Sequence, residues 1–426
     1  MLEKQTKYVA NRWVTFAILV LGGGTIFKLS SLKDAFYVPM QQYMGLTHTQ
    51  IGLALSVYGI VQTIGLIFSI YLSDRFSKKY MISSSLVGVG VVGFYLATFP
   101  PFAGVLLAFG ILAIFAEVVY WPVLLKAVRL TGSESEQGRI FGFLEAGRGV
   151  VDTVVAFSAL AIFSFAGANA AGLKAAIIFF SVVVIIVGII SYFAVPHDEI
   201  KEVNKNGEKV GRSAIAFEGT MKAIKTLDIW VVAFNIFSVY CVYCGLTYFI
   251  PFLQEIYALP LTLVGAYGII NQYGLKMIGG PVGGLLADKV FKSSAKYIRF
   301  AFVIVIISMS IFVCLPHESM NVYVGMACTL GFGAIIFTMR AVFFAPMDEI
   351  KVPREISGAA MSIGSLIGYF PSTFAFTLYG SMLDKNPGMA GYKNVFLTMI
   401  GFAVMGLTIS SYLVKIIKKR QALENA

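Results

Sequence analysis

The chain has 426 residues, of which 58% are hydrophobic and 13% are charged, and its formal net charge is +11. A mean hydropathy of +0.81, with about half the charged share of a typical soluble domain, excludes a soluble globular protein. The apolar runs are about 20 residues long and do not alternate with polar residues. They therefore exclude a membrane β-barrel and predict an all-α integral membrane protein.

Breaks between the apolar runs predict twelve transmembrane helices. In chain order, the expected spans are residues 13–37, 47–72, 80–99, 103–125, 138–165, 172–195, 228–254, 260–286, 296–315, 320–346, 356–383 and 392–416. The longest polar stretch separates the sixth span from the seventh, and its mixture of charged residues with Asn, Gly and Ser is typical of a solvated linker. We expect an N-terminal six-helix bundle (1–195), a cytoplasmic linker (196–227) and a C-terminal six-helix bundle (228–426).

Positive charge concentrates in the loops that follow even-numbered spans. Only four of the 33 Lys and Arg residues fall in the opposite loops, namely Lys33, Lys174, Lys385 and Lys393. The positive-inside rule then places both termini in the cytoplasm. The basic start leads into an apolar segment that is too long for a signal peptide. We expect a multi-pass protein of the inner or plasma membrane.

Ionisable residues inside the spans are the strongest indication of function, because a charge at the bilayer centre costs about 2.5–3.5 kcal/mol on insertion scales. Seven lie well inside: Lys28, Glu117, Glu145, Arg148, Asp152, Lys276 and Arg340. The i, i+3, i+7 spacing places Glu145, Arg148 and Asp152 on one face of the fifth span. At about 1.5 Å per residue, Arg148 lies about 15 Å and Lys28 about 22 Å into their helices, near mid-membrane.

Four bases against three acids leave one excess positive charge, which attracts an anion in a cavity of low dielectric constant. We expect substrate contacts from Arg148, Lys28, Lys276 and Arg340, joined by Tyr243 and Gln272, since Arg suits carboxylate, sulfonate and phosphate geometry. Glu145, Glu117 and Asp152 would supply counter-charge or take up a coupled proton. In the alternative, Glu145 pairs with Arg148 and Asp152 with Lys28 only as conformational locks, and Arg340 snorkels to the interface.

An acidic and basic loop motif recurs at half-chain spacing. Asp74-Arg75 follows the second span and Asp288-Lys289 follows the eighth, 288 − 74 = 214 residues apart. Gly284-x-Leu-Ala-Asp288-Lys289, with its degraded copy around Asp74-Arg75, resembles the cytoplasmic signature of the major facilitator superfamily. The resemblance implies two bundles around a central cavity that opens alternately to either side, in a monomer. We expect all four charged residues of these loops to act in gating.

A finer resemblance points to the organophosphate:anion antiporter branch and its less characterised relatives. It rests on Trp121-Pro122 followed by Lys126, on the run 138–149 and on the run 357–369. In that branch one base from the first span and one from the seventh grip phosphate. Lys28 matches the first, with Lys33 as a competing alignment, whereas the seventh span has no Lys or Arg and places Tyr243 near that position. This departure speaks against phosphate-ester exchange.

The sequence shows no enzyme site. Its three histidines are far apart, and it has neither a zinc-binding spacing nor a nucleophile elbow, so we expect no metal and no cofactor. We expect a secondary active transporter of a small organic anion (carboxylate, sulfonate or sugar acid) that works by alternating access, coupled to protons or to counter-anion exchange. A proton-coupled carrier of neutral sugars or drugs is the alternative, followed by a membrane receptor that does not transport.

Overall fold

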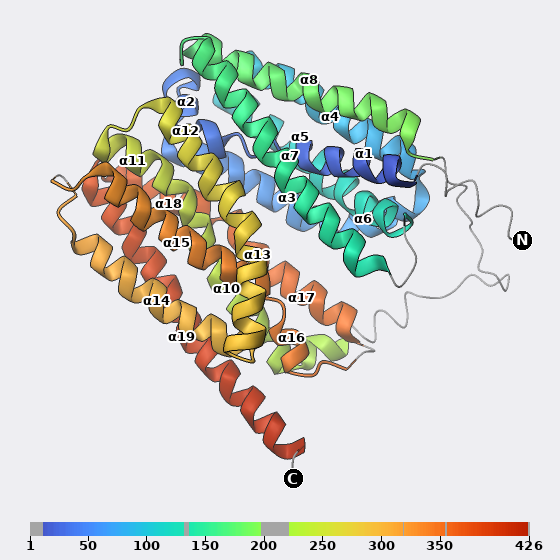
Figure 1. Cartoon of the computed structure of the whole chain (residues 1–426), viewed down its shortest axis with the longest axis vertical. Coiled ribbons are helices and arrows are strands. Elements are labelled where there is room, and N and C mark those ends of the chain that lie inside the picture. Colours follow the sequence, from blue (N-terminus) through green and yellow to red (C-terminus); the bar gives the residue numbers. More distant parts are fainter. Residues whose placement is uncertain (1–11, 132–135, 197–220, 318, 354–355, 425–426) are drawn as a thin grey trace, which may run out of the picture. The chain divides into compact units, whose positions relative to one another are not determined.

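The structure is a computed structural model that describes residues 12–131, 136–196, 221–317, 319–353 and 356–424. Within these ranges every regular element is a helix and no strand occurs (Figure 1). The side chains of residues 66–75, 137–138, 358 and 423–424 lie outside the described part although their backbones are helical. The predicted all-α class is confirmed.

The elements follow the predicted order of spans. The first half contains α1 (Arg12–Thr25), α2 (Lys33–Met44), α3 (His48–Arg75), α4 (Lys78–Ala97), α5 (Phe102–Ala113), the π-helix η2 (Ile114–Tyr120), α6 (Trp121–Arg129), α7 (Gln137–Phe165) and α8 (Ala170–Ala194). Leu124 and Leu144 are among its fully buried apolar side chains.

The second half contains α10 (Leu227–Gly245), the 3₁₀ turn η4 (Leu246–Tyr248), α11 (Phe249–Tyr257), α12 (Leu261–Ile269), the π-helix η5 (Ile270–Gly274), α13 (Leu275–Leu285), the π-helix η6 (Leu286–Val290), α14 (Ser294–Cys314), α15 (Val322–Val342), α16 (Pro346–Glu349), α17 (Ser357–Tyr369), the 3₁₀ turn η8 (Phe370–Thr373), α18 (Ala375–Lys385) and α19 (Met389–Glu424). Over the described residues, nine helices or continuous helical runs are long and apolar enough to cross a membrane. The other three expected spans correspond to α1 with α2, to α3, and to the run from α12 to η6.

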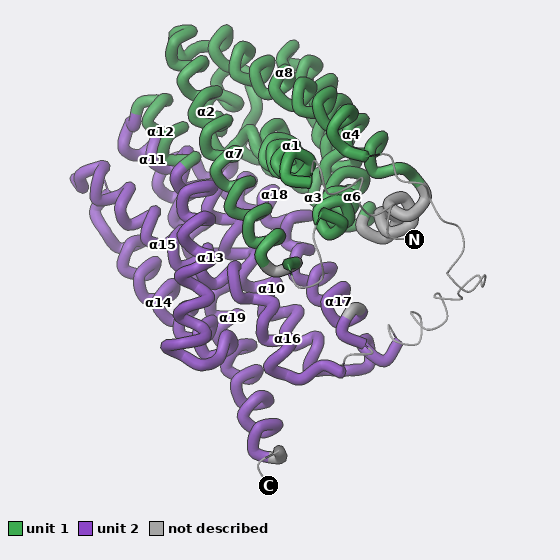
Figure 2. Tube along the Cα trace, turned by 45° about the vertical axis from the view of Figure 1, so that its right-hand side comes forward, with its two compact units in different colours: residues 1–202, 260–269 green, residues 203–259, 270–426 purple. Residues whose placement is uncertain are grey.

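The helices form two compact units, shown in different colours in Figure 2. Unit 1 comprises Met1–Glu202 with Pro260–Ile269, and unit 2 comprises Val203–Leu259 with Ile270–Ala426. The segment Pro260–Ile269 therefore belongs with unit 1, where α12 packs on α2 and α7. Gly265 permits this approach, because a Cβ atom there would lie 2.6 Å from a methyl group of Leu160.

The first span is not one continuous helix as the sequence predicts. α1 ends at Thr25, residues 26–32 form successive turns, and α2 starts at Lys33. Hydrogen bonds within the turns, such as Ser31 N to Phe27 O at 2.9 Å, keep their backbone groups satisfied. The interruption follows Gly22-Gly23-Gly24, a run with low helix propensity. Lys28 therefore lies in the non-helical segment.

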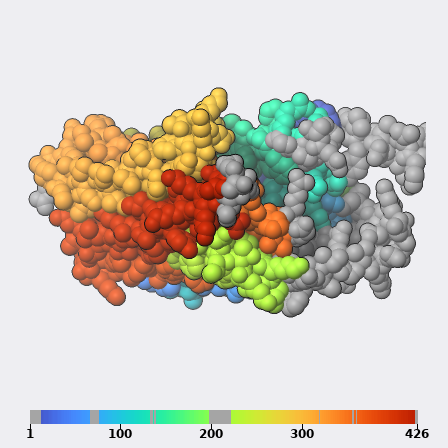
Figure 3. Space-filling model, turned by 90° about the horizontal axis from the view of Figure 1, so that it is seen from below, coloured from blue at the N-terminus to red at the C-terminus, as the bar shows by residue number. Residues whose placement is uncertain are grey.

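In unit 2, α10 packs against α17 and α19, and α13 packs against α15. α19 has 36 residues and would be about 54 Å long, well beyond a bilayer core of about 30 Å. Its last turns extend past the other helices of the unit in Figure 1. Figure 3 shows its end beside the first turns of α10, where Arg420 forms an ion pair with Asp228.

Candidate functional site

The first group of intramembrane charges lies in unit 1 and is called the Arg148 cluster: Arg148, Glu145, Lys28 and Asp152. On α7, Arg148 Nη1 donates to Glu145 Oε1 at 2.7 Å, as the i, i+3 spacing allows. Arg148 Nε donates to the carbonyl oxygen of Gly23 at 3.0 Å. The guanidinium carbon lies 4.5 Å from the centre of the Trp121 ring. Arg148 is thus held by a carboxylate, a carbonyl and an aromatic face.

The glycine run of α1 makes this arrangement possible. A Cβ atom on Gly23 would lie 2.9 Å from Cδ of Arg148, and one on Gly24 would lie 2.6 Å from Cβ of Val151. A Cβ atom on Gly22 would lie 2.4 Å from the Tyr120 hydroxyl. Any larger residue would push α1 away from its neighbours, so these glycines set the position of α1 against the Arg148 side chain.

The second ion pair of the cluster connects the turn segment to α7. Lys28 Nζ lies 2.6 Å from Asp152 Oδ1 and donates to the Asp152 carbonyl oxygen at 3.1 Å. The exposed fractions of the two side chains are 2% and 9%. Lys33 and Asp34 form a further buried pair, at 2.5 Å. The two bases and two acids of the Arg148 cluster sum to zero charge.

Glu117 lies beside this cluster but is not paired with a base by direct contact among the described residues. Tyr58 donates a hydrogen bond of 3.1 Å to Glu117 Oε1, and Gln62 makes a second one. Arg148 acts on Glu117 electrostatically. A carboxyl group held by neutral donors near a paired arginine has the surroundings of a group that can exchange a proton.

The three π-helices among the described elements each contain a residue that the sequence singled out. Glu117 lies in η2, Gln272 in η5, and Asp288 with Lys289 in η6. A π-helix inserts a residue into the α-helical pattern and is frequent at functional sites. No pattern in the sequence predicts these insertions.

The second group of charges lies in unit 2 and is called the Arg340 cluster: Arg340, Tyr240, Tyr243 and Tyr369. Arg340, on α15, has its guanidinium carbon 4.0 Å from the centre of the Tyr243 ring and 5.5 Å from that of Tyr240. The Tyr240 ring contacts Tyr243 at 5.2 Å and Tyr369 at 5.1 Å between centroids. Helices α10, α15 and α17 thus supply one cation and three phenol rings.

No carboxylate of the described residues forms an ion pair with Arg340. Aromatic faces contact the guanidinium instead, and each such contact contributes about 0.5–2 kcal/mol without neutralising the charge. The electrostatic neighbours of the guanidinium are Tyr243, Tyr240 and Tyr369. Arg340 is therefore a partly buried cation with no carboxylate beside it among the described residues, a suitable partner for an anion.

Two other predicted substrate contacts in unit 2, Lys276 and Gln272, differ from each other in exposure. Lys276, on α13, is exposed rather than deep in the protein. Gln272 is 5% exposed, and no described contact joins it to the Arg340 cluster. Its neighbour Asn271 is fully buried, and neither atom of its amide has a hydrogen-bond partner among the residues that the structure describes. A Cβ atom on Gly333 of α15 would lie 2.4 Å from Asn271 Oδ1, so this amide packs directly on α15.

The predicted gating residues are only partly visible. Asp74 and Arg75 end α3, and their side chains lie outside the described part of the chain. Asp288 and Lys289 are exposed on η6. The N-terminus of α14 is capped by Ser293, whose hydroxyl accepts from Lys296 N at 3.2 Å, and by Glu349, which accepts from Ser294 N and Ala295 N. The sequence analysis did not single out Glu349.

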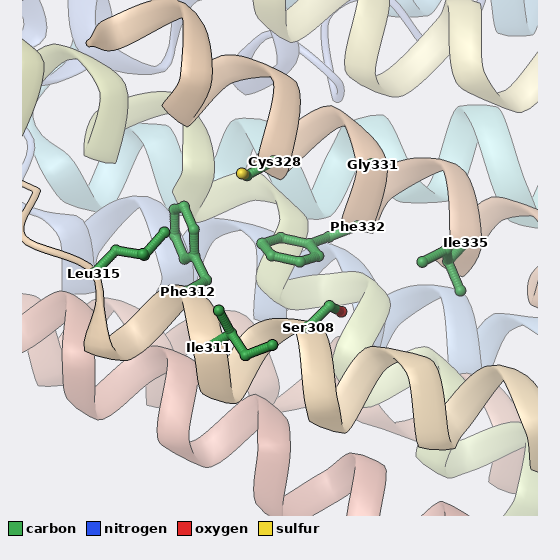
Figure 4. Close-up of a pocket in the computed structure, with 8 residues that line it drawn as sticks. All are labelled: Ser308, Ile311, Phe312, Leu315, Cys328, Gly331, Phe332 and Ile335. Atoms are coloured by element: carbon green, nitrogen blue, oxygen red, sulfur yellow. The ribbon is translucent and has the colours of Figure 1, made fainter. Parts of the chain in front are cut away.

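A cavity of about 330 Å³ lies between α14 and α15, and Figure 4 shows its lining. Its residues are apolar apart from one hydroxyl and one thiol: Ser308, Ile311, Phe312, Leu315, Cys328, Gly331, Phe332 and Ile335. It shares no residue with the Arg340 cluster and offers no charged group to an ionic ligand.

The chain is similar to known membrane proteins over most of its length. The model of the Major Facilitator Superfamily matches residues 18–376. The chain is 51% identical over 417 residues to inner membrane protein YihN of Escherichia coli K12, covering 96% of this chain and 97% of that protein. It is 31% identical over 402 residues to inner membrane protein YqcE of the same organism, covering 94% and 93%.

Solved structures show the same fold at low sequence identity. A bacterial homologue of the human lysosomal transporter Spinster, in an inward-facing and unoccupied conformation, matches with a TM-score of 0.76 and 12% identity, covering 96% of this chain and 98% of that one. A mutant of the nucleoside transporter NupG matches with a TM-score of 0.72 and 14% identity, covering 95% and 100%.

Proposed function

The chain belongs to the Major Facilitator Superfamily, and from this premise we propose that it is a secondary active transporter that moves a small organic anion by alternating access. The superfamily and its structural neighbours point to transport rather than to enzymatic catalysis. The single observation that supports an anionic substrate is the Arg340 cluster, in which a partly buried guanidinium has aromatic neighbours and no carboxylate partner among the described residues.

Arg340 is the main substrate contact in this proposal. A carboxylate or sulfonate would form charge-assisted hydrogen bonds with its N–H groups, which are roughly twice as strong as neutral ones. The three phenol rings of the cluster, Tyr240, Tyr243 and Tyr369, would contribute hydroxyl donors and flat apolar faces. These fit the hydroxyl groups and the apolar C–H faces of a substrate with a hydroxylated carbon skeleton, such as a sugar acid. The sequence predicts Arg340 as one of four basic substrate contacts, from its position inside a span and not from a family motif.

The Arg148 cluster has a different role in the proposal. Its bases are neutralised by Glu145 and Asp152, so a substrate anion would have to displace a carboxylate to reach either base. Protonation of Glu145 or Glu117 would weaken the hold on Arg148 and would couple proton uptake to conformation. This is the conformational role that the sequence left open for the bases and acids of this cluster.

The proposal is tested with purified protein in detergent and in proteoliposomes. Gluconate, as a sugar acid, and ethanesulfonate, as a sulfonate, serve as probes in thermal-shift and flux measurements. We expect at least one probe class to stabilise the protein and to be transported, and Arg340→Gln to abolish both effects with the fold intact. Arg299→Gln is the matched control, because Arg299 is exposed on α14.

The neutral-substrate alternative is favoured by one observation, the complete pairing of the Arg148 cluster. In a carrier of neutral solutes these charges would serve only as locks and as a proton relay. Neutral sugars would then stabilise the protein and organic anions would have no effect. Stabilisation by anions in an Arg340-dependent manner excludes this alternative.

A further inference from the structure

We infer that the substrate site selects organic anions that carry one negative charge and rejects those that carry two. The inference rests on the proposed anion transport and adds a charge rule to it. Its basis is the number of cations that the Arg340 cluster presents. Arg340 is the one base of this cluster, and its electrostatic neighbours are three tyrosines.

No second base assists Arg340 within the described part of unit 2. The groups that act on the Tyr240 hydroxyl are Arg340, Cys244, Tyr243 and Tyr369, with no lysine among them. Lys276, the other intramembrane base of this unit, is exposed on α13 and is not among the groups that act on Arg340. In unit 1, Arg148 and Lys28 are each paired with a carboxylate. Arg340 is therefore the base that has to balance the charge of a bound anion.

The surroundings make an extra negative charge costly. An aromatic ring presents a negative face, and the face of Tyr243 is already directed at Arg340. Tyr240 contacts both Tyr243 and Tyr369, so the three phenol rings form one contiguous aromatic group beside Arg340. A monoanion paired with Arg340 leaves these surroundings neutral, whereas a dianion leaves a net negative charge among aromatic faces in a partly desolvated site.

Sulfate and phosphate esters of the same alcohol provide a matched test. Both groups are tetrahedral oxyanions, but a sulfate ester keeps one charge at every working pH, whereas a phosphate ester changes from one to about two charges near pH 6. The probes are the sulfate and phosphate esters of ethanol, glycerol and glucose. Binding is measured by calorimetry and thermal shift on the full-length protein between pH 5 and pH 8.

The charge rule predicts how the apparent Kd of a phosphate ester depends on pH. If only the monoanion binds, the apparent Kd of a phosphate ester rises about 100-fold from pH 5 to pH 8, because the monoanionic fraction falls to about 1%. The Kd of the sulfate ester of the same alcohol should stay nearly constant, which controls for any effect of pH on the protein. Arg340→Gln should remove binding of the sulfate ester, and Arg340→Lys should restore part of it.

The outcomes separate this inference from the proposed function. Phosphate esters that bind at pH 8 as tightly as their sulfate counterparts overturn the charge rule and leave anion transport standing. Failure of all six esters to bind at any pH, together with no effect of gluconate or ethanesulfonate, overturns both. Sulfate-ester binding that survives in Arg340→Gln overturns the assignment of the charge rule to Arg340.

Discussion

The two units hold their intramembrane arginines in opposite ways. In unit 1, Arg148 and Lys28 each contact a carboxylate, and the Arg148 cluster sums to zero charge. In unit 2, Arg340 is surrounded by tyrosines and has no carboxylate partner among the described residues. The position of a cation inside a membrane span is therefore insufficient to identify a substrate contact, because the neighbours decide whether its charge is available.

A charge held in an ion pair and a charge held among aromatic rings should differ in what their removal affects, the stability of the fold or the binding of a ligand. Buried ion pairs hold elements together, and removal of one partner leaves an isolated charge that is expensive to keep out of water. A cation among aromatic rings has no such partner to lose, so its neutralisation affects the ligand more than the fold. Substitutions in the two clusters should therefore differ in how much free energy of unfolding they cost.

The largest effect on stability is expected from Asp152→Asn. This variant leaves the Lys28 charge buried without its carboxylate partner and should cost about 3–5 kcal/mol of unfolding free energy. Thermal unfolding in detergent measures it. Arg340→Gln is the comparison, and it should cost less than Asp152→Asn, because it breaks cation–π contacts but no ion pair. Equal losses in the two variants would show that both clusters are structural.

A smaller effect is expected where α1 approaches Arg148. Gly23→Ala places a methyl group 2.9 Å from Arg148 Cδ, and this overpacking should cost about 1–3 kcal/mol. Gly280→Ala on α13 is the matched control, since its Cβ would meet nothing within 4 Å. That control should gain up to about 1 kcal/mol from helix propensity. Equal stability of the two variants would contradict the tight contact between α1 and α7.

The smallest effect is expected from Glu145→Gln. The Glu145 side chain is 53% exposed, whereas that of Asp152 is 9% exposed. Solvent therefore screens the pair of Glu145 with Arg148, and its loss should cost less than about 1 kcal/mol. The same thermal unfolding assay compares it with Asp152→Asn on the same helix. A loss as large as that of Asp152→Asn would mean that the two pairs are equally buried.

Composition and run length were sufficient to predict the all-α membrane class and the order of the spans, because the bilayer imposes both. Periodicity also placed Glu145 and Arg148 within contact, since i, i+3 neighbours on a helix adjoin. The interruption at residues 26–32 was missed, although the glycine run Gly22–Gly24 is a visible signal for close packing and weak helix.

The aromatic surroundings of Arg340 were beyond the reach of the sequence. Tyr369 is 29 residues away along the chain and Tyr240 is 100 residues away, so only the packing of α10, α15 and α17 brings them together. Tyr243 was predicted as a substrate contact and lies beside Arg340, and that role remains a prediction. The exposure of Lys276 was likewise invisible, because hydropathy reports depth in the membrane and not the direction of a side chain.

The central claim is that Arg340 offers its charge to an anion whereas Arg148 does not. The most direct measurement compares the anion affinity of Arg340→Gln with that of the charge-balanced double variant Glu145→Gln/Arg148→Gln, by calorimetry with whichever of gluconate and ethanesulfonate binds the unmodified protein. We predict that binding is lost in Arg340→Gln and is retained within about threefold in the double variant. Loss of binding in the double variant with retention in Arg340→Gln would contradict the account.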